Sequence, residues 1–469
     1  MEVLTTKRNK KKLVHNDYLY YKQKNVKIGI RWVCVHKGLC DGSVTTDDGI
    51  NFVLKFGDHH HKGNTDLINA ERAKCIMKNA AKQNYDIPSR IFALNVIPLS
   101  NESRQLIPKE DSMKRTLRRV RSNIYPKIAK IDDIILEGTQ WSTTGGELNP
   151  EPFLFYDNKN NNNRIIIFSS KTCREILSET KIIYMDGTFS TCPSEFYQVY
   201  ILHASINNLI IPVMYALLQR KNKDTYIELL SAIRDQFVSL SIISIDFEQS
   251  VIQAIKEVFH DEVSVQLCYY HLNQSIWRKV QDLGLAIKYK EDKNFRSAVK
   301  MIPALAFLPT NTVKRGMSIL FNSLKSIEEL DDILVYFNST YVNGTYKSIP
   351  TEYGTIRLVR RPPIFSPYMW NVYNATKEGY GRTNNVSEGF NNKFKNIVRI
   401  RHPNIFIFIE SLQMCNASAV TALTKKRNEI INMPKINHYK DKIKQHCNEF
   451  KCNNDNDILY FLKRISDLI

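Results

Sequence analysis

The sequence predicts an α/β core with a large all-helical insertion, preceded by a small β-rich module at the N-terminus. Near the N-terminus, two cysteines and a run of histidines accompany alternating apolar and polar residues, which suits a small module held together by a metal. Farther along, apolar strand-like runs end in acidic residues and alternate with amphipathic helical segments, as expected for an α/β sheet. More than a hundred residues of helical pattern precede the last acidic motif.

The charge is concentrated at the N-terminus. The 469 residues include 66 Lys and Arg against 47 Asp and Glu, a formal net charge of +19. Residues 1–130 hold 26 of these basic residues and 12 of the acidic ones, which is +14 of the total. A basic N-terminal third favours binding to a polyanion such as nucleic acid, although such a skew also serves solubility.

The composition argues against secreted and membrane proteins. The most apolar window, Leu209–Leu218, is ten residues long and contains a proline, so it is too short for a membrane span. The N-terminus has no apolar stretch typical of a signal peptide. Nine cysteines are too sparse for a disulfide scaffold, and their odd number fits reduced thiols in an intracellular protein.

Residues 1–15 are expected to form a basic arm, because Lys10, Lys11 and Lys12 complete a short basic run. Such a run can be a nuclear address, a phosphate-contacting arm or a solvated tail, and the local sequence does not choose among them. We expect a nuclear protein whose arm contacts DNA.

Residues 16–66 are expected to form a small β module with a metal site. Cys34 and Cys40 are separated by five residues, and eighteen more precede the three histidines His59 to His61. Two thiolates and two imidazoles suit tetrahedral zinc, which a module with little core needs for stability. The spacing lies outside the common finger patterns, so stray cysteines and a His-rich loop are the alternative from spacing alone.

Residues 67–145 are predicted to be a helical bridge. A second helical stretch, Ser112–Ile124, carries basic residues three and four positions apart. Residues at that spacing share a helix face and could meet one phosphate backbone, whereas a charged face in water is the bland alternative. The residues expected to contact DNA are Lys114, Arg115, Arg118, Arg119 and Arg121.

Residues 146–400 read as strands and helices in the order of an RNase H-like sheet. Three antiparallel strands are followed by helix, strand, helix and strand, and in such a sheet the first and fourth strands are neighbours. Asp186 and Asp246 end these two strands, so they are expected to lie side by side. Each alone could be a strand-end cap; together they favour a divalent cation, which relieves their repulsion.

Two further motifs follow the second aspartate. Cys268 and His271 stand in a Cys-x-x-His spacing, which is half of a metal site or simply a buried cysteine and a helix-capping histidine. Glu388 lies in the first turn of a helix that Asn384 or Asn385 could cap. A glutamate there is usually only a partner of the helix dipole.

Several motifs resemble known families. Trp32-x-Cys34, Cys40 and the segment 57–61 resemble a FLYWCH-type zinc finger, which implies Cys34, Cys40, His59 and His61 as zinc ligands and His60 pointing away. Collinear motifs over roughly residues 150–410 resemble the transposase domain of Mutator-like elements (the MULE domain). They are Asp186-Gly-Thr-Phe189, Tyr197-x-x-x-Ile-Leu-His203, Ile245-Asp-Phe-Glu248, Cys268-Tyr-Tyr-His271 and Arg382-Thr-Asn-Asn-Val-Ser-Glu388.

The second resemblance implies a DDE transposase in which Asp186, Asp246 and Glu388 bind Mg²⁺ or Mn²⁺. It further implies that a helical insertion occupies about residues 272–375, and that Cys268 and His271 support the site rather than bind the metal. Such an enzyme binds the terminal inverted repeats of its element, cleaves them with two metal ions and transfers the strands to target DNA. It needs no nucleoside triphosphate, and no P-loop motif occurs in the chain.

The cutting of two DNA ends implies a homodimer or higher oligomer. Residues 401–469 are helical in pattern and could serve oligomerisation or complete the core. The main rival function is a domesticated transposase that regulates transcription through its zinc finger without catalysis. A cellular RNase H-type nuclease is a second rival, but it would need neither a finger nor a long insertion.

Overall fold

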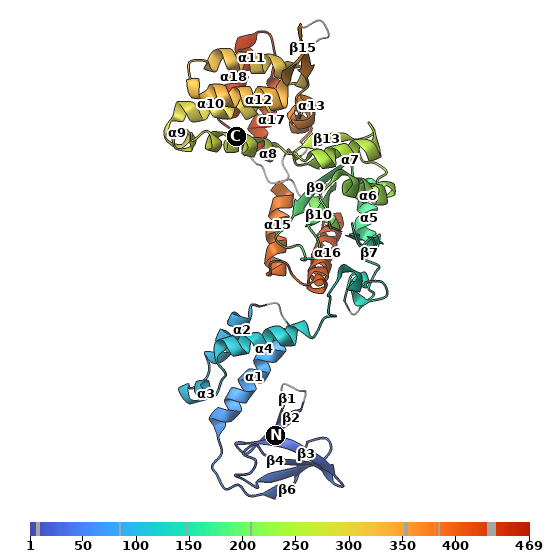
Figure 1. Ribbon diagram of the computed structural model, residues 1–469, viewed down its shortest axis with the longest axis vertical. Helices are drawn as coiled ribbons and strands as arrows, with labels where there is room; N and C mark the ends of the chain where they lie inside the picture. The colour runs from blue at the N-terminus through green and yellow to red at the C-terminus, as the bar shows by residue number, and fades with distance from the viewer. Residues whose placement is uncertain are drawn as a thin grey trace. The chain divides into compact units, whose positions relative to one another are not determined.

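The computed structural model describes the whole chain except residues 6–9, 84–85, 147, 207–208, 351–354, 380, 383–384 and 429–437. The described residues form two compact units, Met1–Ala129 and Lys130–Ile469 (Figure 1). The chain therefore divides within the predicted helical bridge, and residues 130–145 belong to the second unit.

The first unit contains a six-stranded antiparallel sheet whose strands follow one another in chain order. Leu13, Tyr20, Trp32 and Val44 form its buried core. The strands are β1 (Glu2–Thr5), β2 (Lys11–His15), β3 (Tyr18–Val26), β4 (Gly29–Cys34), β5 (Ser43–Thr46) and β6 (Val53–Gly57).

The prediction of a separate basic arm at residues 1–15 is wrong. Strands β1 and β2 occupy most of that segment and pair with the rest of the sheet. Leu4 and Leu13 are buried, and burial of these apolar side chains outweighs the solvation that the neighbouring lysines favour. Residues 7–9 of the basic run lie outside the described residues.

Helices complete the first unit: α1 (Thr65–Gln83), α2 (Pro88–Val96), α3 (Asn101–Gln105) and α4 (Glu110–Ser122). Met77 of α1, Ile91 of α2 and Leu117 of α4 share one apolar cluster. Helix α1 also packs on the sheet, because Ile68 contacts the buried Leu4 and Leu19. Lys12 of β2 forms an ion pair with Glu71 of α1 at 2.8 Å. The six-stranded sheet and these helices therefore belong to one compact unit.

The second unit is built on a seven-stranded mixed sheet with the order β13-β12-β9-β10-β11-β8-β7. Strands β9, β10, β11, β8 and β7 are antiparallel neighbours, whereas β12 and β13 run parallel to β9. The strands are β7 (Leu154–Asp157), β8 (Ile165–Phe168), β9 (Ile182–Thr188), β10 (Gln198–Ile206), β11 (Leu209–Leu218), β12 (Ile242–Ile245) and β13 (Ser264–Leu267). The predicted adjacency of the two strands is confirmed: β9, which contains Asp186, pairs with β12, which ends one residue before Asp246.

Helices cover both faces of this sheet. Figure 1 shows α5 (Lys171–Glu179), α6 (Lys223–Ile233) and α7 (Gln249–Phe259) on one side, with α15 (Asn385–Val398) and α16 (Ile405–Asn428) on the other. Among the described residues, one segment of α16, Ile405–Lys426, is long and apolar enough to cross a membrane. Ile405, Phe408 and Leu412 are fully buried and α16 packs on β11, so core packing accounts for its composition.

A helical lobe follows β13, and the C-terminal helices pack on it. It consists of α8 (Tyr269–Asp282), α9 (Ala286–Glu291), α10 (Lys293–Ala304), α11 (Val313–Leu324), α12 (Asp331–Phe337), α13 (Pro367–Trp370) and α14 (Tyr373–Glu378), with α17 (His438–Glu449) and α18 (Asp455–Ser466). The prediction of an all-helical insertion is wrong, because β14 (Thr345–Pro350) and β15 (Ile356–Arg361) form an antiparallel pair inside it.

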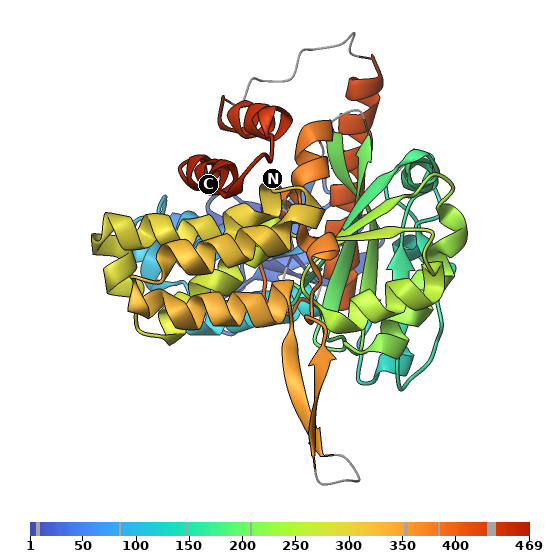
Figure 2. The same cartoon turned by 90° about the horizontal axis from the view of Figure 1, so that it is seen from above.

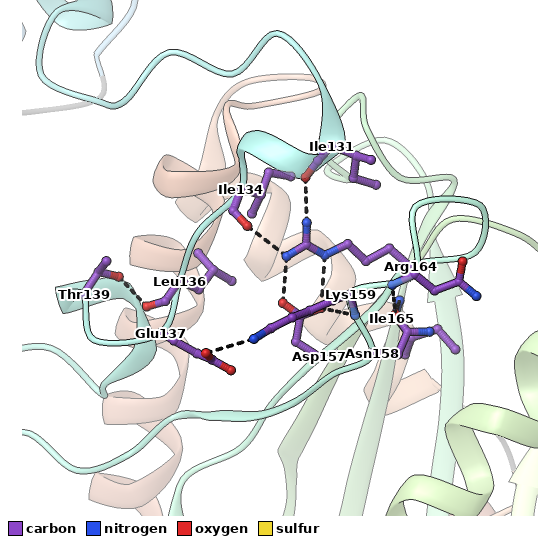
Figure 3. Close-up of polar contacts among 11 residues, drawn as sticks. Ile131, Ile134, Leu136, Glu137, Thr139, Asp157, Asn158, Lys159, Arg164 and Ile165 are labelled. Atoms are coloured by element: carbon purple, nitrogen blue, oxygen red, sulfur yellow. Dashed lines mark hydrogen bonds and ion pairs between the residues drawn. The ribbon is translucent and has the colours of Figure 1, made fainter.

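A buried ion pair fastens the start of the second unit to its sheet (Figure 3). Arg164 donates from Nη2 and Nε to the two carboxylate oxygens of Asp157, at 2.7 and 3.0 Å. Its guanidinium also donates to the carbonyl oxygens of Ile131 and Ile134, at 2.6 and 2.8 Å. Five donors in a planar fork allow one arginine to satisfy the β7–β8 hairpin and the preceding segment together.

Candidate functional site

The four implied zinc ligands converge in the first unit. Cys34 ends β4, Cys40 lies in the following loop, and His59 and His61 follow β6. The distances are 3.3 Å from Cys34 Sγ to His61 Nε2, 3.3 Å from Cys40 Sγ to His59 Nδ1 and 3.4 Å between the two ring nitrogens. Tetrahedral zinc with ordinary bond lengths separates its ligand atoms by about 3.3–3.8 Å, so this donor set fits zinc.

Neighbouring groups orient both imidazoles. The Tyr20 hydroxyl lies 2.8 Å from Nε2 of His59, and Nδ1 of His61 lies 2.8 Å from the carbonyl oxygen of Lys62. These contacts leave Nδ1 of His59 and Nε2 of His61 facing the cysteines, as metal-binding histidines require. Burial lowers the pKa of His59, with His61 adding to the effect, which favours the neutral ring. His60 is exposed, as expected for the residue between two ligands.

Gly42 is a functional residue that the sequence analysis missed. A Cβ atom at this position would lie 2.5 Å from the His59 ring, closer than any real carbon contact. Its amide also lies 3.3 Å from the Cys40 sulfur and donates to it. Glycine is therefore needed for the backbone to approach the metal site. A glycine two residues after the second cysteine was the only signal in the sequence.

The second site begins with the parallel pairing of β9 and β12. Ser244 lies opposite Tyr184 in the register, and two residues farther along each strand stand Asp246 and Asp186. Neighbouring strands are about 4.8 Å apart, so the two carboxylates occupy adjacent positions at one end of the sheet. Their predicted proximity follows directly from the strand order and this register.

Asp186 is the more buried of the two aspartates, with 9% of its surface exposed. Burial, reinforced by the charge of Asp246, raises the pKa of Asp186 to about 7. Nδ2 of Asn391, on α15, donates to Oδ2 of Asp186 at 2.7 Å. Asn391 was not singled out from the sequence, although its position three residues after Glu388 places both on one face of the helix.

Glu388 lies in the first turn of α15 and is half-buried. Burial raises its pKa, with Asp246 adding to the effect and His271 opposing it, so Glu388 lies within electrostatic reach of both. Among the described residues, the carboxylate oxygens of Asp186, Asp246 and Glu388 are not all within 4.8 Å of one another. The predicted cap Asn384 lies outside those residues.

Cys268 and His271 adjoin the aspartates at the start of α8. One donor atom each from Asp246, Cys268 and His271 lies within 4.8 Å of the others, and His271 Nδ1 is 2.8 Å from Asp246 Oδ1. Burial alone would lower the pKa of His271, but Asp246 and then Cys268 outweigh it and raise that pKa above its ordinary value. The raised pKa favours the positively charged ring of His271 beside Asp246.

A buried histidine anchors α15 over the sheet. The hydroxyl of Ser387, next to Glu388, lies 3.2 Å from Nδ1 of His203 on β10. The Phe390 ring packs edge-on against His203 at a centroid distance of 5.2 Å. His203 therefore helps to set the position of the turn that carries Glu388, a role that the sequence motif alone did not reveal.

Replacing His203 by glutamine is expected to reduce the loss of folding stability that occurs as the pH falls. Complete burial lowers the pKa of His203 to about 3, against about 6.5 for an unfolded histidine. Between these values the unfolded chain binds more protons, so stability falls as the pH drops below 6.5. From pH 6.5 to 5 the loss is about 2 kcal/mol. Urea unfolding of both proteins at pH 7 and pH 5 measures it.

The matched control for this prediction is His260→Asn, a change of an exposed histidine that directly follows α7. This variant should lose as much stability between pH 7 and pH 5 as the wild-type protein does. If His203→Gln lost as much stability as the wild-type protein between pH 7 and pH 5, His203 would not be the titrating group.

The predicted DNA-contacting residues fall into two groups. Lys10, Lys11, Arg115, Arg118 and Arg119 are exposed. The other three are half-buried. Lys12 pairs with Glu71, Lys114 pairs with Glu110 and Asp111, and Arg121 donates to the carbonyl oxygens of Ala81 and Asp86. Arg121 thereby joins α4 to the end of α1, and its role is structural.

Two segments of the chain match models of known protein families. Residues 3–61 match the family model of the FLYWCH zinc finger domain, and these residues include all four converging ligands. Residues 182–275 match the model of the MULE transposase domain, which includes Asp186, Asp246, Cys268 and His271 but ends before Glu388. A search of the curated proteins gives no match to the chain. The chain therefore contains a FLYWCH zinc finger domain at residues 3–61 and a MULE transposase domain at residues 182–275.

Proposed function

We propose that this protein is a DNA transposase that cleaves the ends of its element and transfers the strands to target DNA with the help of divalent metal ions. The observation that carries the proposal is the parallel β9–β12 pair, because its register makes Asp186 and Asp246 neighbours, and Glu388 on α15 lies within electrostatic reach of Asp246. The match to the MULE transposase domain supports the same activity.

The sheet supports assignment to the RNase H-like class. Strands β11, β10, β9, β12 and β13 have the order 3-2-1-4-5 expected for that class, with the first three antiparallel and the last two parallel to β9. The β7–β8 hairpin extends the sheet beyond β11. This extension lies at the opposite edge of the sheet from β12 and β13.

The donor set fits hard divalent cations. The pKa values of Asp186 and Glu388 are both raised. A cation such as Mg²⁺ or Mn²⁺ prefers carboxylate oxygens and would stabilise the ionised form of both side chains. Two such ions, when bound, would activate the attacking oxygen and neutralise the phosphoryl group. Asp186, Asp246 and Glu388 would hold these ions.

The remaining residues prepare these carboxylates. Asn391 fixes Oδ2 of Asp186 through its amide, and His271 holds Oδ1 of Asp246. His203 and Ser387 hold the first turn of α15. Asp186 must lose its proton before it can bind a cation, so metal affinity should rise as the pH increases through about 7.

DNA recognition is assigned to the first unit. The finger, held by zinc, would read the terminal inverted repeats in the nucleus, while exposed cations such as Arg115, Arg118 and Arg119 contact phosphates. Cleavage of two ends would require a dimer or higher oligomer. The rival function is DNA binding by a domesticated transposase without catalysis, which the FLYWCH finger alone would support.

A nicking assay separates the two functions. The full-length protein is incubated with Mg²⁺ and a plasmid carrying the sequences that flank its coding region, where inverted repeats are expected. The wild-type protein should cleave the DNA, and Glu388→Gln should lower the rate by at least about 100-fold with unchanged DNA affinity. The control Glu378→Gln, at an exposed position ending α14, should retain activity. Binding without cleavage by the wild-type protein would favour the regulator.

A further inference from the structure

We infer that the β14–β15 ribbon is an arm that binds duplex DNA beside the metal site. Every residue of β14 and β15 is exposed except Val359, which is half-buried. Figure 2 shows the ribbon projecting from the second unit, away from both the sheet and the helices of the lobe. Two strands without a packing partner do not form a core, so their exposed side chains are available to another molecule.

The register of the ribbon separates its side chains into two unlike faces. Lys347 lies opposite Val359, Arg361 opposite Thr345 and Arg357 opposite Ile349. Because side chains alternate along a strand, these three cations share one face. The opposite face carries the exposed apolar side chains of Tyr346, Ile356 and Leu358, with one cation, Arg360.

The charge of the ribbon identifies the occupant as a polyanion. Neither strand contains an acidic residue, and among the described residues no ion pair involves Lys347, Arg357 or Arg361. The three cations occupy successive same-face positions along the ribbon, about 7 Å apart. A row of this kind suits successive phosphates, and the major groove of DNA, about 12 Å wide, admits a two-stranded ribbon.

The base of the ribbon is fixed next to the catalytic aspartates. Phe365, four residues after β15, packs against Phe247 at a centroid distance of 4.9 Å, and Phe247 directly follows Asp246. Gln249 donates to the carbonyl oxygen of Ile364 at 3.3 Å. Six residues of an extended strand span about 20 Å. An arm of this length could lie along about six base pairs of a duplex that is bound at the metal site.

This inference rests on the proposed function for its ligand, but it is tested by binding rather than cleavage. The variant Lys347→Ala/Arg357→Ala/Arg361→Ala is compared with the control Lys290→Ala/Lys314→Ala/Lys325→Ala, which removes three exposed charges from the helical lobe. Full-length, zinc-loaded protein is titrated onto a fluorescent 40-base-pair duplex of mixed sequence, without Mg²⁺, at salt concentrations from about 50 to 200 mM. Circular dichroism verifies that the variants are folded.

The ribbon variant should bind at least about tenfold more weakly, and the slope of log K against log salt should fall by about 2–3, since each lost phosphate contact removes about 0.9. The control should keep the wild-type slope. An unchanged slope in the ribbon variant, or an equal decrease in the control, would overturn the arm.

A second copy of the chain is the competing occupant. The variant Ile356→Thr/Leu358→Thr changes the apolar face of the ribbon and is examined by sedimentation. Loss of an oligomer in this variant, together with an unchanged salt slope in the cation variant, would assign the ribbon to subunit contact and overturn the inference. If the wild-type protein does not cleave DNA but its binding depends on the ribbon cations, the arm is supported and only the proposed catalytic activity is rejected.

Discussion

Replacing Asp186 by asparagine is expected to stabilise the metal-free protein and to abolish Mg²⁺-dependent cleavage. The pKa of Asp186 is about 7 in the folded chain and 3.8 ordinarily, so the free-energy cost of burying its charge grows as the pH rises from about 4 to 7. This cost is about 4 kcal/mol at pH 8 and about 2 kcal/mol at pH 5. Asparagine can still accept the hydrogen bond from Asn391 but has no charge to bury.

Thermal unfolding of zinc-loaded, Mg²⁺-free protein measures this effect. The midpoint for the second unit should rise by about 5 °C at pH 8 and by less at pH 5. Adding Mg²⁺ should stabilise the wild-type protein but not Asp186→Asn, because binding to the native state alone is stabilising. The control Asp261→Asn, at an exposed turn after α7, should change neither. A lower midpoint at pH 8, or retained cleavage, would remove Asp186 from the site.

Removal of zinc is expected to unfold the finger sheet. Structural zinc in small fingers contributes apparent binding free energies of about 10–16 kcal/mol, more than the core around Trp32 and Tyr20 could replace. Cys34→Ser should therefore release the metal, weaken DNA binding and expose the backbone amides of β2 to β6. Zinc analysis and hydrogen exchange measured by mass spectrometry locate the change along the chain.

Cys452→Ser, a change at an exposed cysteine of the second unit, is the control and should keep both zinc and protection. Gly42→Ala should resemble Cys34→Ser, because its Cβ would displace the His59 ring. Full zinc content and wild-type exchange in Cys34→Ser would show that Cys34 is not a ligand.

The sequence predicted the parts of the fold that depend on apolar runs and their order. The runs ending at Asp186 and Asp246 form the adjacent strands β9 and β12, because a buried strand needs little beyond a continuous apolar segment. The resemblance to a FLYWCH-type zinc finger predicted a cluster of cysteines and histidines, whose atoms lie 3.3–3.4 Å apart. In both cases residue type and strand order were sufficient for the prediction.

The sequence failed where packing overrides local composition. The lysines around Leu13 concealed strand β2, whose single buried side chain fixes it to the sheet. Strands β14 and β15 were hidden by a helical context and by Pro350, which an edge ribbon tolerates. Asn391 and His203 act through contacts with residues about 200 positions away, and the pattern of a single sequence does not reveal such pairs.

The docking of α15 on β10 has a consequence for protein synthesis. Under the proposed mechanism, the third carboxylate arrives only after the ribosome has translated almost 400 codons and Ser387 has met His203. A nascent chain or a prematurely terminated product that ends in the helical lobe would carry the finger and both aspartates but no Glu388. Such fragments could occupy DNA without cutting it, and an aberrant short transcript would yield a competitor of the full-length enzyme.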